Sequence, residues 1–226
     1  MKGTGDDSMT RKILLAAGGT GGHIIPSIAF GQWLRDRGES VVWLTGSRAL
    51  ETDIFTAHGE RPLKILLEGS PLGVRGVRSL KRWKQLASSY FECRAALERE
   101  RADCCVLFGG YLSMPVLLAA RRLGIPVLMH EQNTVAGKVT RFASRRGVPV
   151  ACAWKECRLL DKEKINVTGL PLRPLPLIDK NEAQTRLIGA PLEGRQKLVV
   201  ILGGSLGSGG MKNMLQSSQD MIKSTG

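Results

Sequence analysis

The sequence predicts an α/β protein built on a doubly wound parallel sheet, followed by the start of a second unit of the same kind. Apolar runs alternate with amphipathic segments along residues 12–168, and such alternation is typical of a parallel sheet covered by helices on both faces. Glycine pairs follow the first and fourth of these runs. A further apolar run at 198–202 leads into another glycine-rich loop at 203–210, which indicates that a second unit begins there.

The first predicted strand, 13–17, runs into Gly18-Gly19-Thr20-Gly21-Gly22-His23. A strand, a glycine turn and a helix together form a phosphate-binding arrangement, because the ligand can approach the backbone closely and meets the free N–H groups of the helix. Thr20 and His23 add a hydroxyl and an imidazole. A dinucleotide fingerprint would need a third glycine where Ile24 stands, and the lysine of a nucleotide-triphosphate loop is absent. A tight turn that only packs helix on sheet stays open as an alternative.

The remaining elements follow in order. The first helix is expected to start near Pro26 and to end at Gly38. Its apolar face is expected to carry Ala29, Phe30, Trp33 and Leu34. A short helix at 48–58 should turn Leu50, Ile54 and Phe55 inward and stop at Gly59. The other predicted elements are strands at 40–44, 63–67, 103–108, 125–129, 148–153 and 165–168, a long helix before residue 103, and a helix at 112–123.

Polar loops are expected to meet at one edge of this sheet. Right-handed crossovers place every strand-to-helix loop at the carboxyl edge, where ligands bind in such folds. The loops concerned are 18–23, 69–73, Gly109-Gly110-Tyr111 and His130-Glu131-Gln132-Asn133-Thr134. A core needs no glycines, hydroxyls, carboxylates and imidazoles there, so the sequence predicts a polar, phosphate-bearing ligand.

Composition narrows the class of partner. A net charge of +13 indicates a polyanionic partner, while 5% aromatic residues and no nucleic-acid motif argue against nucleic acid. No apolar run is long enough to span a membrane, and residues 1–10 are expected to be a flexible tail. The five cysteines lack metal-ligand spacing, so we expect buried free thiols and no bound metal.

Residues 72–83 form a basic and apolar stretch. Such a stretch fits a segment that lies on an anionic membrane surface, although an ordinary amphipathic helix is the alternative. The expected membrane patch comprises Leu72, Val74, Arg75, Val77, Arg78, Leu80, Lys81 and Trp83.

The chain changes character after the sheet. We expect an N-terminal domain at 11–168, a proline-rich linker at 169–195 with a short helix at 181–188, and the incomplete start of a second domain at 196–226. One strand and one helix bury too little surface to form a core of their own.

These motifs, taken together, resemble the MurG family of glycosyltransferases from about residue 12 to the end. The stretches that carry the resemblance are the glycine loop 18–23, Gly109-Gly110-Tyr111, residues 124–133, Gly169-Leu170-Pro171-Leu172-Arg173 and Gly203-Gly204-Ser205-Leu206-Gly207. The resemblance implies a GT-B fold of two Rossmann-like domains and an inverting enzyme. It implies transfer of N-acetylglucosamine (GlcNAc) from UDP-GlcNAc to the C4 hydroxyl of the muramoyl sugar of lipid I, an undecaprenyl-diphosphate-linked MurNAc-pentapeptide. The product would be lipid II, for peptidoglycan synthesis and hence cell shape and division.

The resemblance also implies roles for individual residues. Residues at sugar-nucleotide-binding positions are Thr20, Gly21, Gly22, Asn133, Arg173 and Ser205. The first glycine loop and the loop of Gly109, Gly110 and Tyr111 would face the acceptor's diphosphate, and 72–83 would match the family's membrane patch. A peripheral protein on the cytoplasmic face of the bacterial plasma membrane is therefore implied. Leu170 and Leu206 stand where asparagine and glutamine are usual, and most of the donor-binding domain is missing, so we expect this chain alone to be inactive.

Two side chains are candidates for catalysis. His23 is our candidate base, since a neutral imidazole can accept the proton of an attacking hydroxyl, although it could merely form hydrogen bonds. Glu131 is the second candidate, with bracing of its loop as the alternative. Helix N-termini and Arg173 could stabilise diphosphate charge, so we expect neither metal nor cofactor. Two competing functions stay open: a non-catalytic module that binds a lipid diphosphate or the cell-wall machinery, and another GT-B or sugar-nucleotide enzyme such as an epimerase.

Overall fold

The computed structural model describes residues 10–67, 77–192 and 197–200, with side chains from residue 84 onward in the second of these ranges. The chain divides into two compact units, 1–172 and 173–226, and each is described by itself.

The first unit contains a parallel sheet of seven strands, which confirms the predicted fold class. The strands are β1 (Lys12–Ala16), β2 (Ser40–Thr45), β3 (Leu63–Lys64), β4 (Cys104–Leu107), β5 (Val127–Glu131), β6 (Val150–Cys152) and β7 (Ile165–Val167). Their order is β3-β2-β1-β4-β5-β6-β7, and each neighbouring pair is parallel. The order reverses between β1 and β4, so the loops after these two strands flank the crevice where ligands bind in such sheets.

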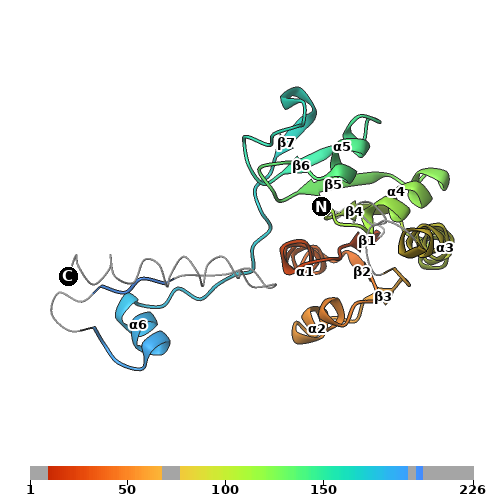
Figure 1. The fold of residues 1–226 in the computed structure, drawn as a ribbon. Coiled ribbons are helices and arrows are strands. Elements are labelled where there is room, and N and C mark those ends of the chain that lie inside the picture. The colour runs from red at the N-terminus through yellow and green to blue at the C-terminus, as the bar shows by residue number, and fades with distance from the viewer. Residues whose placement is uncertain (1–9, 68–76, 193–196, 201–226) are drawn as a thin grey trace, which may run out of the picture. The chain divides into compact units, whose positions relative to one another are not determined.

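Helices cover both faces of the sheet (Figure 1). The described helices of this unit are α1 (Gly21–Arg35), α2 (Ala49–Ala57), α3 (Val77–Glu100), α4 (Ser113–Arg122), α5 (Lys138–Ser144) and the 3₁₀ turn η1 (Lys162–Lys164). α1 and α2 lie on one face, and α3, α4 and α5 on the other. Burial along β1 alternates accordingly: Leu14 packs in the core beneath α3 and α4, and Leu15 in the core beneath α1 and α2.

The start of α1 differs from the prediction. The helix begins at Gly21, five residues before Pro26, which lies inside it. Pro26 has no N–H to donate to the Gly22 carbonyl, so the second turn of α1 lacks one backbone hydrogen bond. The predicted apolar face was also wrong in part, because Trp33 is 48% exposed and stacks on Phe30 at 5.8 Å between ring centroids.

Other elements agree with the sequence more closely. The predicted helix stops at Gly38 and Gly59 are confirmed, and both glycines have a positive φ, 83° and 73°. In α2, Phe55 is buried and Leu50 and Ile54 are half-buried. Helix α5 was not predicted, because it has seven residues and too few apolar positions to show a helical period.

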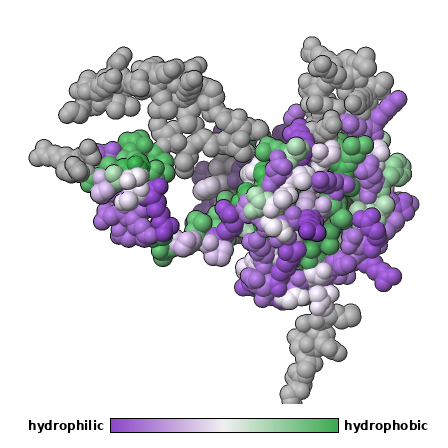
Figure 2. Space-filling model, turned by 90° about the horizontal axis from the view of Figure 1, so that it is seen from below, coloured by the Kyte–Doolittle hydropathy of each residue, from purple (hydrophilic) through white to green (hydrophobic). Residues whose placement is uncertain are grey.

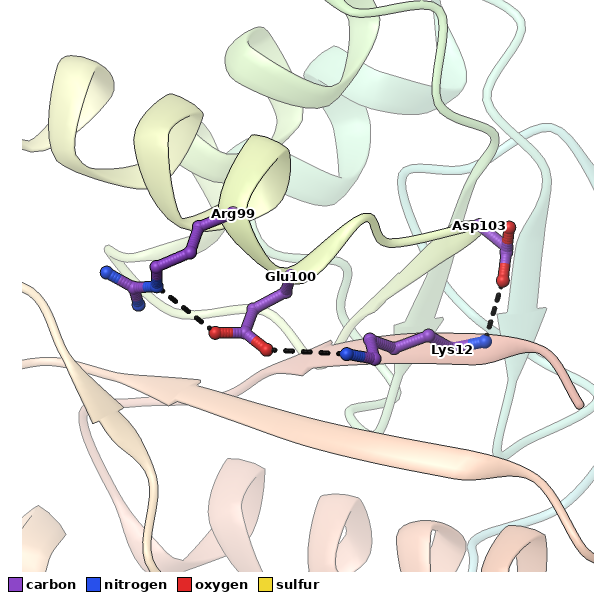
Figure 3. A network of polar contacts seen from close by, with 4 residues as sticks. All are labelled: Lys12, Arg99, Glu100 and Asp103. Atoms are coloured by element: carbon purple, nitrogen blue, oxygen red, sulfur yellow. Dashed lines mark hydrogen bonds and ion pairs between the residues drawn. The ribbon is translucent and has the colours of Figure 1, made fainter.

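Polar contacts hold the amino end of β1 (Figure 3). The backbone N–H of Lys12 donates to the Asp103 carboxylate at 2.7 Å, and Lys12 Nζ lies 3.6 Å from Glu100, which also pairs with Arg99 at 3.2 Å. This network ties β1 to the end of α3 and the start of β4. It lies at the edge of the sheet opposite to the glycine loops.

The cysteines are free, as expected, and Cys104 alone among them is half-buried rather than buried. Burial raises the pKa of the Cys105 thiol to about 12 and that of the Cys152 thiol to about 12, so both are uncharged at neutral pH.

In the second unit, α6 (Lys180–Ile188) is capped at its N-terminus by Asp179, whose side chain accepts from the N–H groups of Asn181 and Glu182. Gly189, with a positive φ, is its C-cap. The predicted buried strand at 198–202 was wrong in its described part, since 197–200 have no regular structure and Val199 is 77% exposed. The described residues of this unit hold no neighbouring strand with which it could pair.

The described surface is mixed. Figure 2 shows green apolar patches between purple polar side chains on the face drawn there. In the part of the chain described, no helix has both the length and the apolar character needed to cross a bilayer.

Candidate active site

The loop between β1 and α1 brings Thr20 and His23 together at the carboxyl edge. Gly19 has a φ of 97°, which lets the chain turn sharply out of the strand. The His23 Nδ1 atom lies 3.2 Å from the Thr20 hydroxyl. Among the described residues, no protein group accepts the backbone N–H of Gly21 or Gly22. These two N–H groups stand at the positive end of α1 and can bind an anion.

The loop between β4 and α4 packs directly against the first. Gly109 and Gly110 both have a positive φ, 86° and 77°. A Cβ atom at Gly110 would lie 2.6 Å from the Gly18 carbonyl oxygen, and one at Gly109 would lie 3.3 Å from His23 Nε2. The positive φ favours glycine at both positions, and at Gly110 the lack of space beside the Gly18 carbonyl requires it as well. The two glycine loops meet backbone to backbone, with the imidazole of His23 beside them.

The loop after β5 is organised by Glu131. One carboxylate oxygen accepts from the backbone N–H of Asn133 at 3.1 Å and from its side-chain amide at 2.9 Å. The other accepts from the Gly137 N–H at 3.0 Å and the Thr140 hydroxyl at 2.7 Å. Glu131 is buried, and these four bonds connect β5 to the start of α5. Of the two roles expected for Glu131, the contacts favour bracing of the loop.

Two clefts open side by side at this edge, and they share His23 and Asn133. One has a volume of about 440 Å³ and is also lined by Gly109, Gly110 and Tyr111. The other has a volume of about 420 Å³ and is lined by residues of the first glycine loop, among others. His23 therefore faces two adjoining spaces, each large enough for part of a sugar diphosphate.

Burial lowers the pKa of His23 below its ordinary value of 6.5, and the nearby Glu131 charge opposes this shift. The imidazole is therefore neutral at pH 7 and able to accept a proton. With Thr20 at Nδ1, its Nε2 atom is the one that lies toward Gly109.

Both ring nitrogens of His130 have hydrogen-bond partners, so it has a structural role. Its Nε2 lies 3.0 Å from the Gly169 carbonyl and its Nδ1 lies 3.1 Å from the Gln132 side-chain amide. Burial lowers its pKa. His130 lines an apolar cavity of about 330 Å³ together with Phe108 and Trp33, and this cavity shares Leu170 with the smaller of the two clefts.

Some expected site residues are not placed at this edge. Arg173 belongs to the second unit, and Ser205 and Leu206 lie outside the described residues, as do Leu72, Val74 and Arg75. The rest of the expected membrane patch falls in the first turns of α3, where the backbone is helical and the side chains lie outside the description: Val77, Arg78, Leu80, Lys81 and Trp83. Their roles stay predictions.

Glu51 is a site residue that sequence reasoning missed. Its buried carboxylate accepts from the Gly19 N–H at 2.5 Å and from the Tyr111 hydroxyl at 2.6 Å. The signal was present, because position 51 lies one turn before Phe55 on the inward face of the predicted helix. An acid on an apolar helix face seldom stays buried without a purpose. Thr140 was missed as well, and no local pattern marked it.

Metal ligation finds no support in the described chain, where no three or more His, Cys, Asp or Glu side chains form a group that could hold an ion.

The chain resembles known proteins in both sequence and fold. A family model described as the glycosyltransferase family 28 N-terminal domain matches residues 13–151. A UDP-N-acetylglucosamine–N-acetylmuramyl-(pentapeptide) pyrophosphoryl-undecaprenol N-acetylglucosamine transferase of Pseudomonas fluorescens is 35% identical over 92% of this chain and 56% of its own length. The transferase of the same name from Synechococcus is 34% identical over 95% of this chain and 58% of its own.

Solved structures of related proteins are similar to this chain in fold. Acinetobacter baumannii MurG superposes with a TM-score of 0.55 and 30% identity over 66% of this chain and 42% of that one. A UDP-GlcNAc 2-epimerase of Neisseria meningitidis shares the fold alone, with a TM-score of 0.52 and 14% identity. The chain spans a little over half the length of the curated relatives named here. Since the family model covers more than half of its residues, this chain belongs to glycosyltransferase family 28, and its sequence relatives there are MurG.

Proposed function

We propose that this chain is the acceptor-binding half of an inverting GlcNAc transferase that converts lipid I to lipid II. The observation that carries the proposal is the meeting of His23, the two glycine loops and Asn133 around two adjoining clefts. MurG relatives whose names state this transfer match nine-tenths of the chain, which supports this substrate class.

The acceptor diphosphate is expected at the glycine loops. The free N–H groups of Gly21 and Gly22 and the positive end of α1 favour negative charge. Gly109 and Gly110 carry no side chains that would keep a phosphate away from the backbone. Tyr111, whose hydroxyl is directed to Glu51, supplies its ring to the wall of the larger cleft.

His23 would act as the general base. In the tautomer whose Nδ1–H donates to the Thr20 hydroxyl, the unprotonated Nε2 would take the proton from the C4 hydroxyl of the muramoyl sugar while that oxygen attacks the anomeric carbon of GlcNAc. The bond between the anomeric carbon and the UDP oxygen would break in the same displacement, and the electron pair would leave with UDP. One displacement inverts the anomeric configuration. Charge on the leaving diphosphate would be stabilised by helix N-termini and Arg173, so the proposal needs neither metal nor cofactor.

Asn133 is the sugar-facing candidate in this loop. Its side-chain amide donates to Glu131 at 2.9 Å, which fixes its orientation at the border of the two clefts. The carbonyl oxygen of that amide is then the atom that would accept a sugar hydroxyl. Glu131 thereby acts on the sugar through Asn133.

Donor binding would depend on residues beyond this unit. The resemblance assigns the uracil pocket and the ribose-binding acid to the second domain, and the chain covers only about half the length of its relatives. Acceptor binding is therefore the part of the proposed activity that the residues of this unit would carry. Its place would be the cytoplasmic face of the plasma membrane, held there by the patch at 72–83.

Acceptor binding by the 226-residue chain tests the proposal. A short-chain, soluble lipid I analogue is titrated against the chain, with a matched prenyl monophosphate that lacks the sugar as the control ligand. We expect saturable binding of the analogue, weaker binding of the control, and loss of affinity in Gly22→Ala, whose added methyl group meets only the Thr20 hydroxyl at 3.7 Å and so spares the fold. Equal binding of both ligands would indicate a non-catalytic module that binds lipid phosphates without recognising the sugar. Absence of binding would overturn the proposed function.

A further inference from the structure

Glu51 joins three separate loops at the carboxyl edge. It lies in the first turn of α2, which follows β2, yet its partners belong to the loops after β1 and β4. The same oxygen, Oε1, accepts both the Gly19 N–H and the Tyr111 hydroxyl. A buried carboxylate is costly unless it is hydrogen-bonded, so this carboxylate favours the one arrangement in which both loops reach it.

The space around Glu51 is shaped for these contacts. A Cβ atom at Gly46 would lie 2.0 Å from the Tyr111 hydroxyl and 2.5 Å from Glu51 Oε2, and one at Gly18 would lie 3.3 Å from Glu51 Oε1. Only glycine at position 46 lets the tyrosine and the carboxylate meet. Oε2 is buried and has no hydrogen-bond partner among the described residues. The carboxylate therefore forms its hydrogen bonds to both loops through a single oxygen, Oε1.

The two hydrogen bonds of Glu51, here called the tether, hold a glycine that lies next to both Tyr111 and the catalytic candidate. A Cβ atom at Gly19 would lie 3.8 Å from the Tyr111 ring and 4.0 Å from His23 Nδ1, so Gly19 stands between them. Holding the Gly19 N–H fixes the sharp turn from which Thr20 and His23 project. Holding the Tyr111 hydroxyl fixes the wall of the larger cleft.

We propose that Glu51 is a positioning residue: its carboxylate locks the two glycine loops together and so pre-forms the acceptor cleft around His23 and Tyr111. The proposal rests on the proposed function, because it assigns the tether to acceptor binding. It predicts that the cleft loses affinity for acceptor when the tether is removed, even where the sheet remains folded.

The test compares variants of the whole 226-residue chain in two measurements, amide hydrogen exchange at Gly19 without ligand and affinity for the short-chain lipid I analogue. Glu51→Ala is expected to speed Gly19 exchange and to weaken binding about tenfold or more, as loops lose their alignment. Glu51→Gln keeps an oxygen that can accept both bonds and should restore most of the affinity. Tyr111→Phe should weaken binding in the parent chain but have little further effect beside Glu51→Ala, since the two residues act as a pair.

Glu60 provides the matched control. It is another buried glutamate, three residues beyond the C-terminal end of α2, and it pairs with Arg35 at 2.9 Å rather than with a glycine loop. Glu60→Gln should lower stability while leaving Gly19 exchange and analogue affinity unchanged. Equal losses of affinity in the Glu51 and Glu60 variants, or full affinity in Glu51→Ala, would overturn the positioning role. If the parent chain itself fails to bind, the proposed function falls. Faster Gly19 exchange in Glu51→Ala than in Glu60→Gln would in that case still show that Glu51 holds the glycine loop, and equal exchange would overturn that as well.

Discussion

The Nδ1 atom of His23 lies 3.2 Å from the Thr20 hydroxyl, three residues earlier in the same glycine loop. This contact occupies one ring nitrogen and leaves Nε2 toward Gly109 and the larger cleft. The loop therefore orients the imidazole as well as carrying it. A base must present its free nitrogen to the substrate, so this short-range contact is the geometric core of the proposed chemistry.

Removal of the His23 imidazole gives the first prediction. In a transfer-competent form that carries the complete second domain, His23→Ala should lower turnover by about two to four powers of ten, the usual contribution of general acid–base catalysis. His58→Ala is the control, since His58 lies at the C-terminal end of α2 and is not among the residues that line the two clefts. Turnover is measured with radiolabelled UDP-GlcNAc. Near-normal turnover in His23→Ala would remove the residue from the role of base.

The pH dependence follows from the lowered pKa of His23. Burial disfavours the charged imidazolium, so NMR titration of the 226-residue chain should place the His23 midpoint below 6.5, and Glu131→Gln should lower it further by removing a nearby negative charge. Transfer should accordingly persist somewhat below pH 6.5 and fall at more acid pH.

The lowered pKa of His23 also makes the folding stability fall at acid pH. The unfolded chain binds this proton more tightly, so the stability owed to the neutral His23 is present above pH 6.5 and is lost as the pH falls through the folded-state pKa. A His23 midpoint at or above 6.5 would contradict both statements.

We expect Glu131 to contribute mainly to the stability of the fold rather than to catalysis. Glu131→Ala would leave the Gly137 N–H and the Thr140 hydroxyl without their acceptor and should cost about 2–4 kcal/mol in the free energy of unfolding. Urea denaturation measures this loss. Glu98→Ala, which removes only an exposed pairing with Arg94, should change stability by less than about 1 kcal/mol. Unchanged stability with abolished transfer would instead support a catalytic Glu131.

The glycine at position 46 should be irreplaceable. Gly46→Ala would drive a methyl group into the Tyr111 hydroxyl and the Leu67 carbonyl, and overpacking of this kind costs about 1–3 kcal/mol. Thermal unfolding of Gly46→Ala beside Gly22→Ala makes the comparison, because the second site has ordinary space. Equal melting temperatures would show that the three loops can shift to accommodate the added methyl group at little cost.

The patch at 72–83 gives a prediction about membranes. Trp83→Ser combined with Arg78→Gln and Lys81→Gln should reduce cosedimentation with anionic phospholipid vesicles, because it removes both apolar insertion and charge attraction. The matched control is Leu118→Ser with Arg121→Gln and Arg122→Gln, three exposed residues of α4 with the same loss of charge. Equal reductions in both variants would mean that net charge alone drives binding.

Local patterns in the sequence determined the parallel α/β class, most element positions and the polar loops after the first, fourth and fifth predicted strands. Hydrophobic periodicity and glycine stops act over a few residues, so they can be read directly. These patterns did not predict three features that depend on the rest of the structure. Pro26 lies inside α1 rather than at its start, and α5 is too short to show a period. The described residues of the predicted strand 198–202 have no neighbouring strand with which to pair.

Only the tertiary structure decided which loops touch. The strand order sets β1 beside β4, and this brings His23 against Gly109 and lets Glu51 reach two loops at once. The lowered pKa of His23 likewise arises from burial, which depends on how distant segments pack. A chain's own periodicity carries local preference, whereas contacts across about sixty residues, such as Glu51 with Tyr111, exist only once the sheet has assembled.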